Sequence, residues 1–410
     1  MTMLIRTTLL GLIICVACQE HLFAAETSQA VRPVRFSVGF FGQATDNRDA
    51  VAEDKTGNTD IYVRPKLELV YETEASRLDL HYTPAFRYRS DPGDTQDETT
   101  WQHDFGVAAS RLVSDRMRLR FNGVIQKQDD PAIEEGGITR RGDLSYTRSA
   151  VDAGMNFDVM KYSNVDIVLQ NRMKRYDDDI IAATSDEDEN TIRVEHRHQM
   201  TRTLRSLLTG GYSVYTYDSS LDLERDFSSG LVAIGVENAF TPNTLGSISV
   251  GSQTRDYQDE GIDSDNAPYV RVSLEGLLAE DLRIGCSLGQ GVRDTDAYPF
   301  VSQEYSEFRG FGNAMLSSKV RLRVSATYRV STYKEDNIPS NVTAADIAAG
   351  EALGYGASGD ETTIVGDAEL TFTAAENLSF FAGIRIEDID SDVGQSYTKN
   401  TGRIGASVSL

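Results

Sequence analysis

The stretch VRLRVSATYRV, residues 320–330, alternates apolar and polar side chains. One set reads Val, Leu, Val, Ala, Tyr, Val, and the other reads Arg, Arg, Ser, Thr, Arg. Because successive side chains of a strand point to opposite faces, the stretch predicts a β-strand with one apolar and one charged face. The same period of two recurs in residues 61–71, 78–88, 117–121, 282–288, 378–386 and 404–410. The pattern predicts an all-β protein.

Short turns and long polar loops alternate along the chain. Tight turns are expected at residues 74–76, 114–116, 160–164, 201–203, 242–244, 279–281, 317–318 and 375–377. Long polar loops are expected at residues 46–58, 90–98, 128–142, 177–189, 218–227, 258–267, 294–303, 334–361 and 390–399. This layout predicts a closed antiparallel transmembrane β-barrel of about 18 strands (16–18), with short periplasmic turns and long extracellular loops.

Three features favour a membrane barrel over a soluble β-protein. The apolar-faced stretches have about the ten residues that a tilted strand needs to cross a bilayer. Closure satisfies every backbone donor and acceptor in lipid. Aromatic residues occur where these stretches meet the long loops, as expected at headgroup level, for example Phe41, Tyr62, Tyr88, Tyr146, Tyr176, Tyr217, Phe227, Tyr257, Tyr269 and Tyr333. A soluble sandwich, propeller or β-helix is the alternative.

The chain divides into three parts. Residues 1–25 have the pattern of a signal peptide, with Arg6, a short apolar core and a small-residue end at Ala24 and Ala25. A membrane-anchoring helix and lipidation at Cys18 are the alternatives. An N-terminal extension, residues 26–33, and a single barrel, residues 34–410, follow. Of three cysteines only Cys286 lies outside the signal, so no intramolecular disulfide is expected after cleavage.

The chain is acidic: 410 residues carry 40 Lys and Arg against 63 Asp and Glu, a formal charge of −23. No basic stripe is available for phosphates, which argues against nucleic acid as a partner. Acidic residues gather in the expected loops, notably at 177–189 and 256–265. They are interpreted as solvated loops, or as carboxylates that bridge Ca²⁺ or Mg²⁺ to lipopolysaccharide. No metal ligands and no cofactor are predicted.

The polar faces of the strands predict the lining of a lumen. The candidate pore-lining residues are Arg64, Lys66, Arg87, Arg118, Arg120, Arg172, Arg321, Arg323, Arg329 and Arg385. One interpretation is a cationic wall that concentrates anions and sets selectivity. The other is cross-strand ion pairing with acidic residues on the same face, which only keeps the wall polar and rigid.

Catalysis finds little support in the sequence. His196 and His198 share a face with Ile192 and Val194, the face expected to meet lipid. No nucleophile and base are placed together by the pattern, so no enzyme and no catalytic residue are predicted. The longest loop, residues 334–361, contains a possible short helix at 343–350 and either folds into the pore or forms an exposed flap.

Residues 59–131 resemble outer-membrane β-barrel porin families that are largely uncharacterised. The segments IYVRPKLELVYETEASRLDLHYTPAFRYRSDPGDT and RLVSDRMRLRFNGVIQKQDDP carry the resemblance. The last strand is similar to the sorting signal of outer-membrane proteins, with apolar residues at 404, 406, 408 and 410, although it ends in Leu410 rather than an aromatic residue. The resemblance implies a bacterial outer-membrane location and passive transport.

We therefore expect a porin-like channel for passive diffusion of small polar solutes or ions. A structural or secretion-associated barrel without an open pore, serving export of a surface polymer, is the alternative. The expected partners are outer-membrane lipids, lipopolysaccharide and, through the C-terminal strand, the assembly machinery. Whether the protein forms a homo-oligomer stays open.

Overall fold

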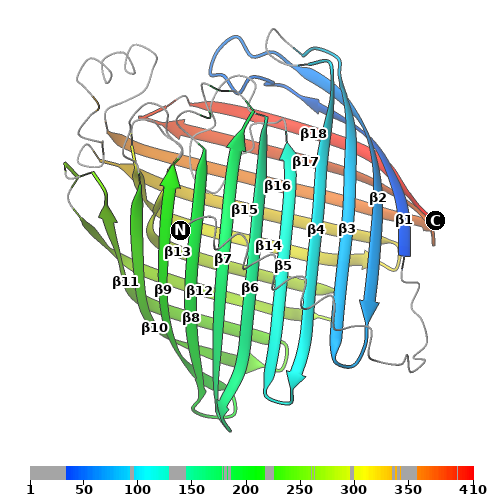
Figure 1. Ribbon diagram of the computed structural model, residues 1–410. Helices are drawn as coiled ribbons and strands as arrows, with labels where there is room; N and C mark the ends of the chain where they lie inside the picture. The colour runs from blue at the N-terminus through cyan, green and yellow to red at the C-terminus, as the bar shows by residue number, and fades with distance from the viewer. Residues whose placement is uncertain are drawn as a thin grey trace. The chain divides into compact units, whose positions relative to one another are not determined.

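The strands form one closed antiparallel sheet (Figure 1). The computed structural model describes residues 34–92, 97–128, 145–177, 179, 182, 186–217, 226–259, 261–262, 264–295, 300–334, 338, 342, 358–394 and 396–410. The predicted signal peptide, the N-terminal extension and the helix at 343–350 lie outside these residues. Within them, no helix is long and apolar enough to span a membrane.

Eighteen strands make up the sheet, as the alternation predicted. They are β1 (Val34–Thr45), β2 (Asn58–Glu72), β3 (Ser76–Arg89), β4 (Thr99–Ser114), β5 (Met117–Gln128), β6 (Tyr146–Met160), β7 (Ser163–Tyr176), β8 (Glu187–Gln199), β9 (Leu204–Tyr217), β10 (Phe227–Thr241), β11 (Thr244–Tyr257), β12 (Asp265–Ala279), β13 (Leu282–Asp294), β14 (Ser302–Ser317), β15 (Val320–Tyr333), β16 (Gly359–Ala375), β17 (Leu378–Ser391) and β18 (Tyr397–Ser409).

Each strand pairs with its neighbours in sequence, and β1 pairs with β18 to close the barrel. The closing register runs from Ser37 opposite Ser409 to Thr45 opposite Thr401. The last residue takes part, since the backbone N–H of Leu410 donates to the carbonyl of Phe36 at 2.8 Å. Closure leaves no free sheet edge, which is the condition for a sheet to cross a bilayer.

The connections confirm the predicted layout. All eight even-to-odd connections, such as residues 115–116 and 242–243, are tight turns, and they meet at one end of the barrel (Figure 1). The odd-to-even connections are the longer loops at the other end. In outer-membrane barrels short turns face the periplasm and long loops face the outside. Four strands begin three residues inside the expected loops: β8 at Glu187, β12 at Asp265, β16 at Gly359 and β18 at Tyr397.

Two prolines interrupt the ladder between β2 and β3. Pairing runs to Val63 opposite Phe86 and resumes at Leu67 opposite Tyr82 in the same register, which places Pro65 and Pro84 opposite each other. Proline lacks the N–H that a ladder needs. The two missing donors therefore fall in one local gap, and no bulge is needed to accommodate them.

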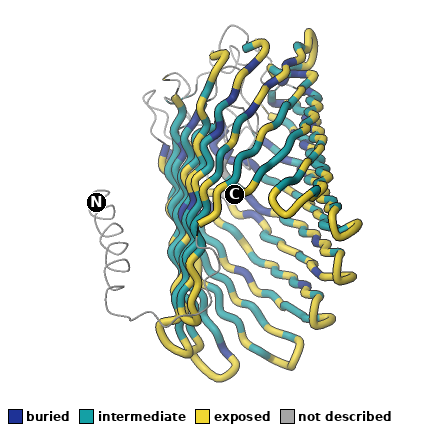
Figure 2. Tube along the Cα trace, turned by 90° about the vertical axis from the view of Figure 1, so that its right-hand side faces the viewer, coloured by how far each residue is buried: buried dark blue, intermediate teal, exposed yellow. Residues whose placement is uncertain are grey.

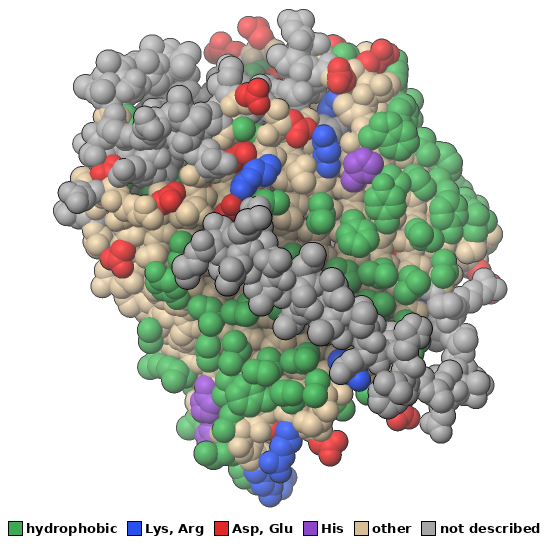
Figure 3. All heavy atoms as spheres, viewed as in Figure 1, with side chains coloured by type: hydrophobic (Ala, Val, Ile, Leu, Met, Phe, Trp, Pro, Cys, Tyr) green, Lys and Arg blue, Asp and Glu red, His purple; other side chains and the backbone are tan. Residues whose placement is uncertain are grey.

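Hydrophobic side chains cover the outside of the barrel. On β10 and β11 these are Val232, Ile234 and Val250, each at least 45% exposed. Figure 3 shows such side chains gathered over the face formed by β3–β9, with charged side chains above and below them. In Figure 2 exposed and intermediate residues alternate along the strands. A soluble protein does not leave a continuous apolar surface of this extent in water, so this band is the lipid-facing surface.

Candidate functional site

The candidate site is the inner face of the barrel. In each strand the residues alternating with the exposed apolar ones point inward. On β15, for example, Val324 and Tyr328 face outward, while Arg323 and Arg329 lie on the other face. By the same alternation all ten predicted pore-lining residues lie on inward positions. Their role in a pore stays a prediction.

Six of the ten have a carboxylate partner on the inner face. These pairs are Lys66–Glu68 at 2.6 Å, Arg87–Asp60 at 2.5 Å, Arg120–Asp166 at 2.6 Å, Arg172–Glu189 at 3.4 Å, Arg323–Glu369 at 3.9 Å and Arg385–Glu387 at 2.5 Å. Four of these pairs join different strands and fit the interpretation as cross-strand pairing, whereas Lys66–Glu68 and Arg385–Glu387 each lie within one strand. Arg87 and Asp60 are almost fully buried, whereas the other five basic side chains of the set remain partly accessible.

The other four behave differently. Arg64 lies over the ring of Phe41, with its Cζ 5.2 Å from the ring centroid. Arg321 directs its Nε to the sulfur of Met315 at 3.4 Å. Buried Arg329 donates to the hydroxyl of Thr363 at 3.4 Å and interacts electrostatically with Glu361. No side-chain partner is recorded for Arg118 within the described ranges. The expected Arg321, Arg323 and Arg329 wall is thus not one uniform charged surface.

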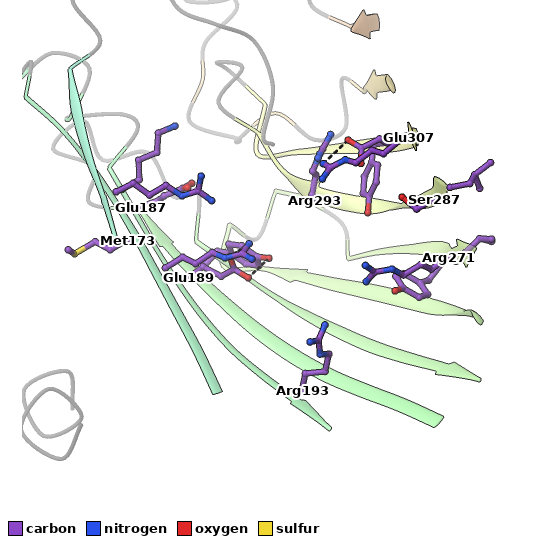
Figure 4. A pocket seen from close by; sticks show the side chains of 18 residues that line it. Met173, Glu187, Glu189, Arg193, Arg271, Ser287, Arg293 and Glu307 are labelled. Carbon is purple, nitrogen blue, oxygen red and sulfur yellow. Dashed lines mark hydrogen bonds and ion pairs between the residues drawn. The ribbon is translucent and has the colours of Figure 1, made fainter. Parts of the chain in front are cut away.

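A cavity of about 510 Å³ lies inside the barrel toward the loop end. It is lined by two arcs of the wall, β6–β9 and β12–β14 (Figure 4). Its basic residues are Arg148, Arg172, Lys174, Arg193, Arg271, Arg293 and Arg309, and its acidic residues are Glu187, Glu189 and Glu307. We call this the basic cavity. Seven basic against three acidic side chains make it cationic, although the whole chain is strongly acidic.

Three cations of the basic cavity are not neutralised by neighbours. Within the described part of the chain, Arg148, Arg193 and Arg271 have no carboxylate at ion-pair distance. Arg148 also lies directly opposite Lys174 in the β6–β7 ladder. Like charges facing each other across a ladder destabilise a sheet. The facing pair Arg148 and Lys174 therefore does not stabilise the sheet at this point.

Aromatic rings support several inward cations. The Cζ of Arg293 lies 4.4 Å from the ring centroid of Tyr305, and Lys174 lies within 6 Å of the ring centroids of both Tyr146 and Tyr176. A ring face attracts a cation but does not cancel its charge. These rings thus leave the positive charge of the inner wall in place.

Sequence analysis predicted one lining residue of this cavity, Arg172, among its ten pore-lining candidates. It missed Arg148, Arg271, Arg293 and Arg309, and it assigned Glu187 and Glu189 to a loop. The structure corrects that assignment, because both glutamates lie on β8. The alternation Glu189, Thr191, Arg193, Glu195 against apolar Ile192 and Val194 continues the strand pattern and is the signal that could have found them.

The loop end of the barrel holds a second group of residues, which are apolar and buried. Phe300, Tyr333 and Val393 form one cluster, and Tyr217, Phe227, Ile262 and Val301 form another. Together we call them the mouth cluster. Phe300, Val301 and Val393 are completely inaccessible, although all three lie in loops. The predicted inward segment, residues 343–350, lies outside the described residues, so the loops seen to fold inward are others.

The histidine pair is on the outer face, as expected. His196 and His198 lie on the same side of β8 as exposed Ile192 and Val194, with ring centroids 6.5 Å apart. The hydroxyl of Ser163 is 2.8 Å from Nδ1 of His198. In the described ranges, no group of three or more His, Cys, Asp or Glu is placed to hold a metal ion.

A closed sheet with an apolar exterior, a polar interior, tight turns at one end and long loops at the other defines the class: a bacterial outer-membrane β-barrel.

Comparisons with known proteins do not narrow the class to a family. No protein-family model matches the chain, and no curated protein matches it. Solved structures that align with it include OccK2 (OpdF) of Pseudomonas aeruginosa, at 11% identity over 93% of this chain and 99% of that one, TM-score 0.47. The siderophore receptor PirA of Pseudomonas aeruginosa aligns at 11% identity, 94% and 81% coverage, TM-score 0.45. OccAB4 of Acinetobacter baumannii aligns at 10% identity, 92% and 98% coverage, TM-score 0.44. Identities and TM-scores of this size assign the chain to no family.

Proposed function

We propose that the barrel is a porin-like channel through which small polar solutes and ions diffuse passively, and that its lumen favours anions. The observation that carries the proposal is the basic cavity, with seven basic and three acidic side chains inside a chain of charge −23. A cleft lined by one sign of charge between low-dielectric walls raises the local concentration of the opposite ion. Among the residues that the structure describes, no acidic residue of a loop lines this cavity.

Within the cavity, the unneutralised cations Arg148, Arg193 and Arg271 are the residues proposed to set selectivity. They come from three strands, β6, β8 and β12, so they surround the path rather than mark one side of it. The candidate pore-lining residues with carboxylate partners, such as Lys66 and Arg120, contribute less to the electrostatic field of the lumen because their charge is balanced locally.

The test is ion selectivity in a planar lipid bilayer. The purified protein should give discrete conductance steps, and under a KCl gradient its reversal potential should show preference for chloride. Replacing Arg148, Arg193 and Arg271 by Gln should move the reversal potential toward potassium. Replacing Arg116, Arg202 and Lys319 by Gln is the matched control, because these exposed cations lie in tight turns outside the lumen. Equal shifts in the two triple variants would contradict the role of the cavity.

The second candidate function is a barrel without an open pore, structural or linked to export of a surface polymer. The mouth cluster is the observation that favours it, since buried apolar side chains occupy the loop end. A bilayer that stays tight although the protein has inserted would support this candidate against the first.

We propose lipids, lipopolysaccharide and the assembly machinery as further partners, on the basis of the apolar band and the last strand. The apolar band contacts membrane lipids and lipopolysaccharide, and β18 with Leu410 is the segment for the assembly machinery. We propose neither a catalytic role nor a nucleic-acid partner. A homo-oligomer is one further arrangement in which part of the outer surface would contact a second copy.

A further inference from the structure

The mouth cluster is built from loops that leave different parts of the wall. Ile262 belongs to the β11–β12 connection, Phe300 and Val301 to the β13–β14 connection, and Val393 to the β17–β18 connection. Their exposed fractions are 5%, 0%, 0% and 0%. Apolar side chains on outer loops would be wet if the loops stood away from the barrel. Their burial shows that these three loops turn inward and pack.

Their packing partners are inward-facing aromatic residues at the loop ends of the strands. Val301 shares a cluster with Tyr217 at the end of β9 and Phe227 at the start of β10. The ring of Phe227 stacks on that of Tyr215 at 4.3 Å between centroids. Strands β11, β12 and β13 separate β10 from β14, which begins directly after Val301. A cluster that joins the two ends must pass these strands on the lumen side.

A polar contact follows the same path. The hydroxyl of Tyr257, at the end of β11, lies 2.8 Å from the hydroxyl of Ser302, at the start of β14. Two strands, β12 and β13, lie between them in the sheet. Ser302 is completely buried. Val301 is thus packed against residues of β9 and β10, and Ser302 is hydrogen-bonded to β11, both across the inside of the barrel.

Phe300, the residue before Val301, packs against the opposite part of the wall, toward β15 and β18. The ring of Phe300 lies 5.1 Å from that of Tyr333, at the end of β15, and Phe300 shares its cluster with Val393 before β18. Because Phe300 and Val301 are consecutive, the two clusters are joined through one dipeptide. An apolar connection therefore extends inside the mouth from β9 to the loop before β18.

We infer that Phe300 and Val301 form a bridge across part of the extracellular mouth and limit the size of the solutes that reach the basic cavity. This inference rests on the proposed channel function. Because both side chains are completely buried, they act by holding the loops inward and so narrowing the mouth, while charge selection is made deeper, at the arginines of the basic cavity. The two steps are separate: size is selected at the bridge and charge is selected below it.

The test uses the full-length protein with Phe300→Ala and Val301→Ser together, and with Val301→Thr alone. The double variant removes the bridging side chains. Val301→Thr keeps the shape of one bridging side chain and replaces a methyl group by a hydroxyl, so it serves as the milder variant if the double variant does not fold. Phe240→Ala with Val159→Ser is the matched control, because both side chains are exposed at the tight-turn end. Gel mobility before and after boiling reports folding.

We expect a higher single-channel conductance in the double variant and a smaller rise in Val301→Thr. Vesicles that contain the double variant should admit sugars too large for the wild type. The reversal potential should stay on the chloride side, since the basic cavity is intact.

Each outcome separates the inference from the proposed function. A conducting wild type with unchanged conductance and size limit in both variants overturns the bridge and leaves the channel standing. A silent wild type with conducting variants supports the bridge and overturns the open channel. Silence of every folded variant overturns both.

Discussion

Leu169 and Gln170 are neighbours at the centre of β7, yet their surroundings have little in common. Leu169 faces outward and is 49% exposed to the space that lipid fills, whereas Gln170 faces inward and donates to the carboxylate of Asp152 at 2.7 Å. An outward position needs only an apolar side chain of any shape. An inward position needs a side chain that matches its neighbours, because a polar group removed from water is stable only when it has hydrogen-bond or ion-pair partners. The comparison shows that the two faces of one strand follow different rules.

The largest effect should come from the inward face where it is buried. Arg87 and Asp60 form an ion pair whose side chains are only 5% and 2% exposed. Replacing Arg87 by Met leaves a buried carboxylate without its partner and should cost about 3–5 kcal/mol of unfolding free energy. The measurement is urea unfolding in lipid vesicles, followed by the emission of Trp101, the one tryptophan of the chain.

Two controls sharpen this prediction. Replacing both partners, Arg87→Met with Asp60→Leu, should recover most of the loss, because no lone charge remains. Arg205→Met breaks an ion pair with Glu237 in which the arginine is 48% exposed, and should cost only about 0.2–1 kcal/mol. Similar losses for Arg87→Met and Arg205→Met would show that burial does not govern the inward pairs.

The next effect compares the two faces directly. Leu169→Arg puts a charge into the lipid-facing band and should cost about 2–4 kcal/mol, the usual cost near the bilayer midplane. Gln170→Arg puts the same charge beside Asp152 in the lumen and should cost much less. The measurement is the unfolding free energy of both variants, obtained by urea unfolding in the same vesicles. If Gln170→Arg is the more damaging, the assignment of the two faces is wrong.

The smallest effect concerns the pairing of β1 with β18, which we call the seam, at its loop end. Partial burial raises the pKa of Asp46, but hydrogen bonds from the side chain and backbone of Asn400, both 2.7 Å, lower it by more, so the pKa is below its ordinary value. A lowered carboxyl pKa stabilises the fold above the ordinary value near 3.8 and loses that contribution as the pH falls through the folded-state pKa. We expect amide exchange at the loop end of the β1–β18 seam to increase in this acidic window.

Asp46→Asn is the control for the seam. It should show exchange at neutral pH that is already increased, with little further change on acidification. An unchanged pH response in Asp46→Asn would mean that another group controls the seam. Asp226, where burial raises the pKa above its ordinary value despite a hydrogen bond from the N–H of Tyr217, works in the opposite direction and gains stability on acidification.

The fold was predictable because its signal is local. Alternation in residues such as 320–330 depends only on the two-residue period of a strand, and the membrane turns that period into an inside and an outside. The turns near residues 115 and 243 were equally readable. The strand start at Glu187 was not, because a run of acidic residues looks like a loop when its inward partners are unknown.

The candidate site was predictable only in part. That Arg172 and Arg323 point inward follows from counting residues along a strand. Among the described residues, Arg323 contacts Glu369 while Arg193 and Arg271 contact no carboxylate, and this difference depends on the register between strands and on the curvature of the wall. Neither quantity is encoded within a single segment.

The amino-acid sequence by itself determined the barrel, its approximate strand number and which side chains face lipid, since each of these follows from the alternation along the chain. Only the tertiary structure decided which inward cations stay unneutralised and that Phe300 and Val301 bridge the mouth. The bridge joins residues from strands that are neighbours neither in sequence nor in the sheet. The surroundings of the cations and the contacts of the bridge exist only once the barrel has closed.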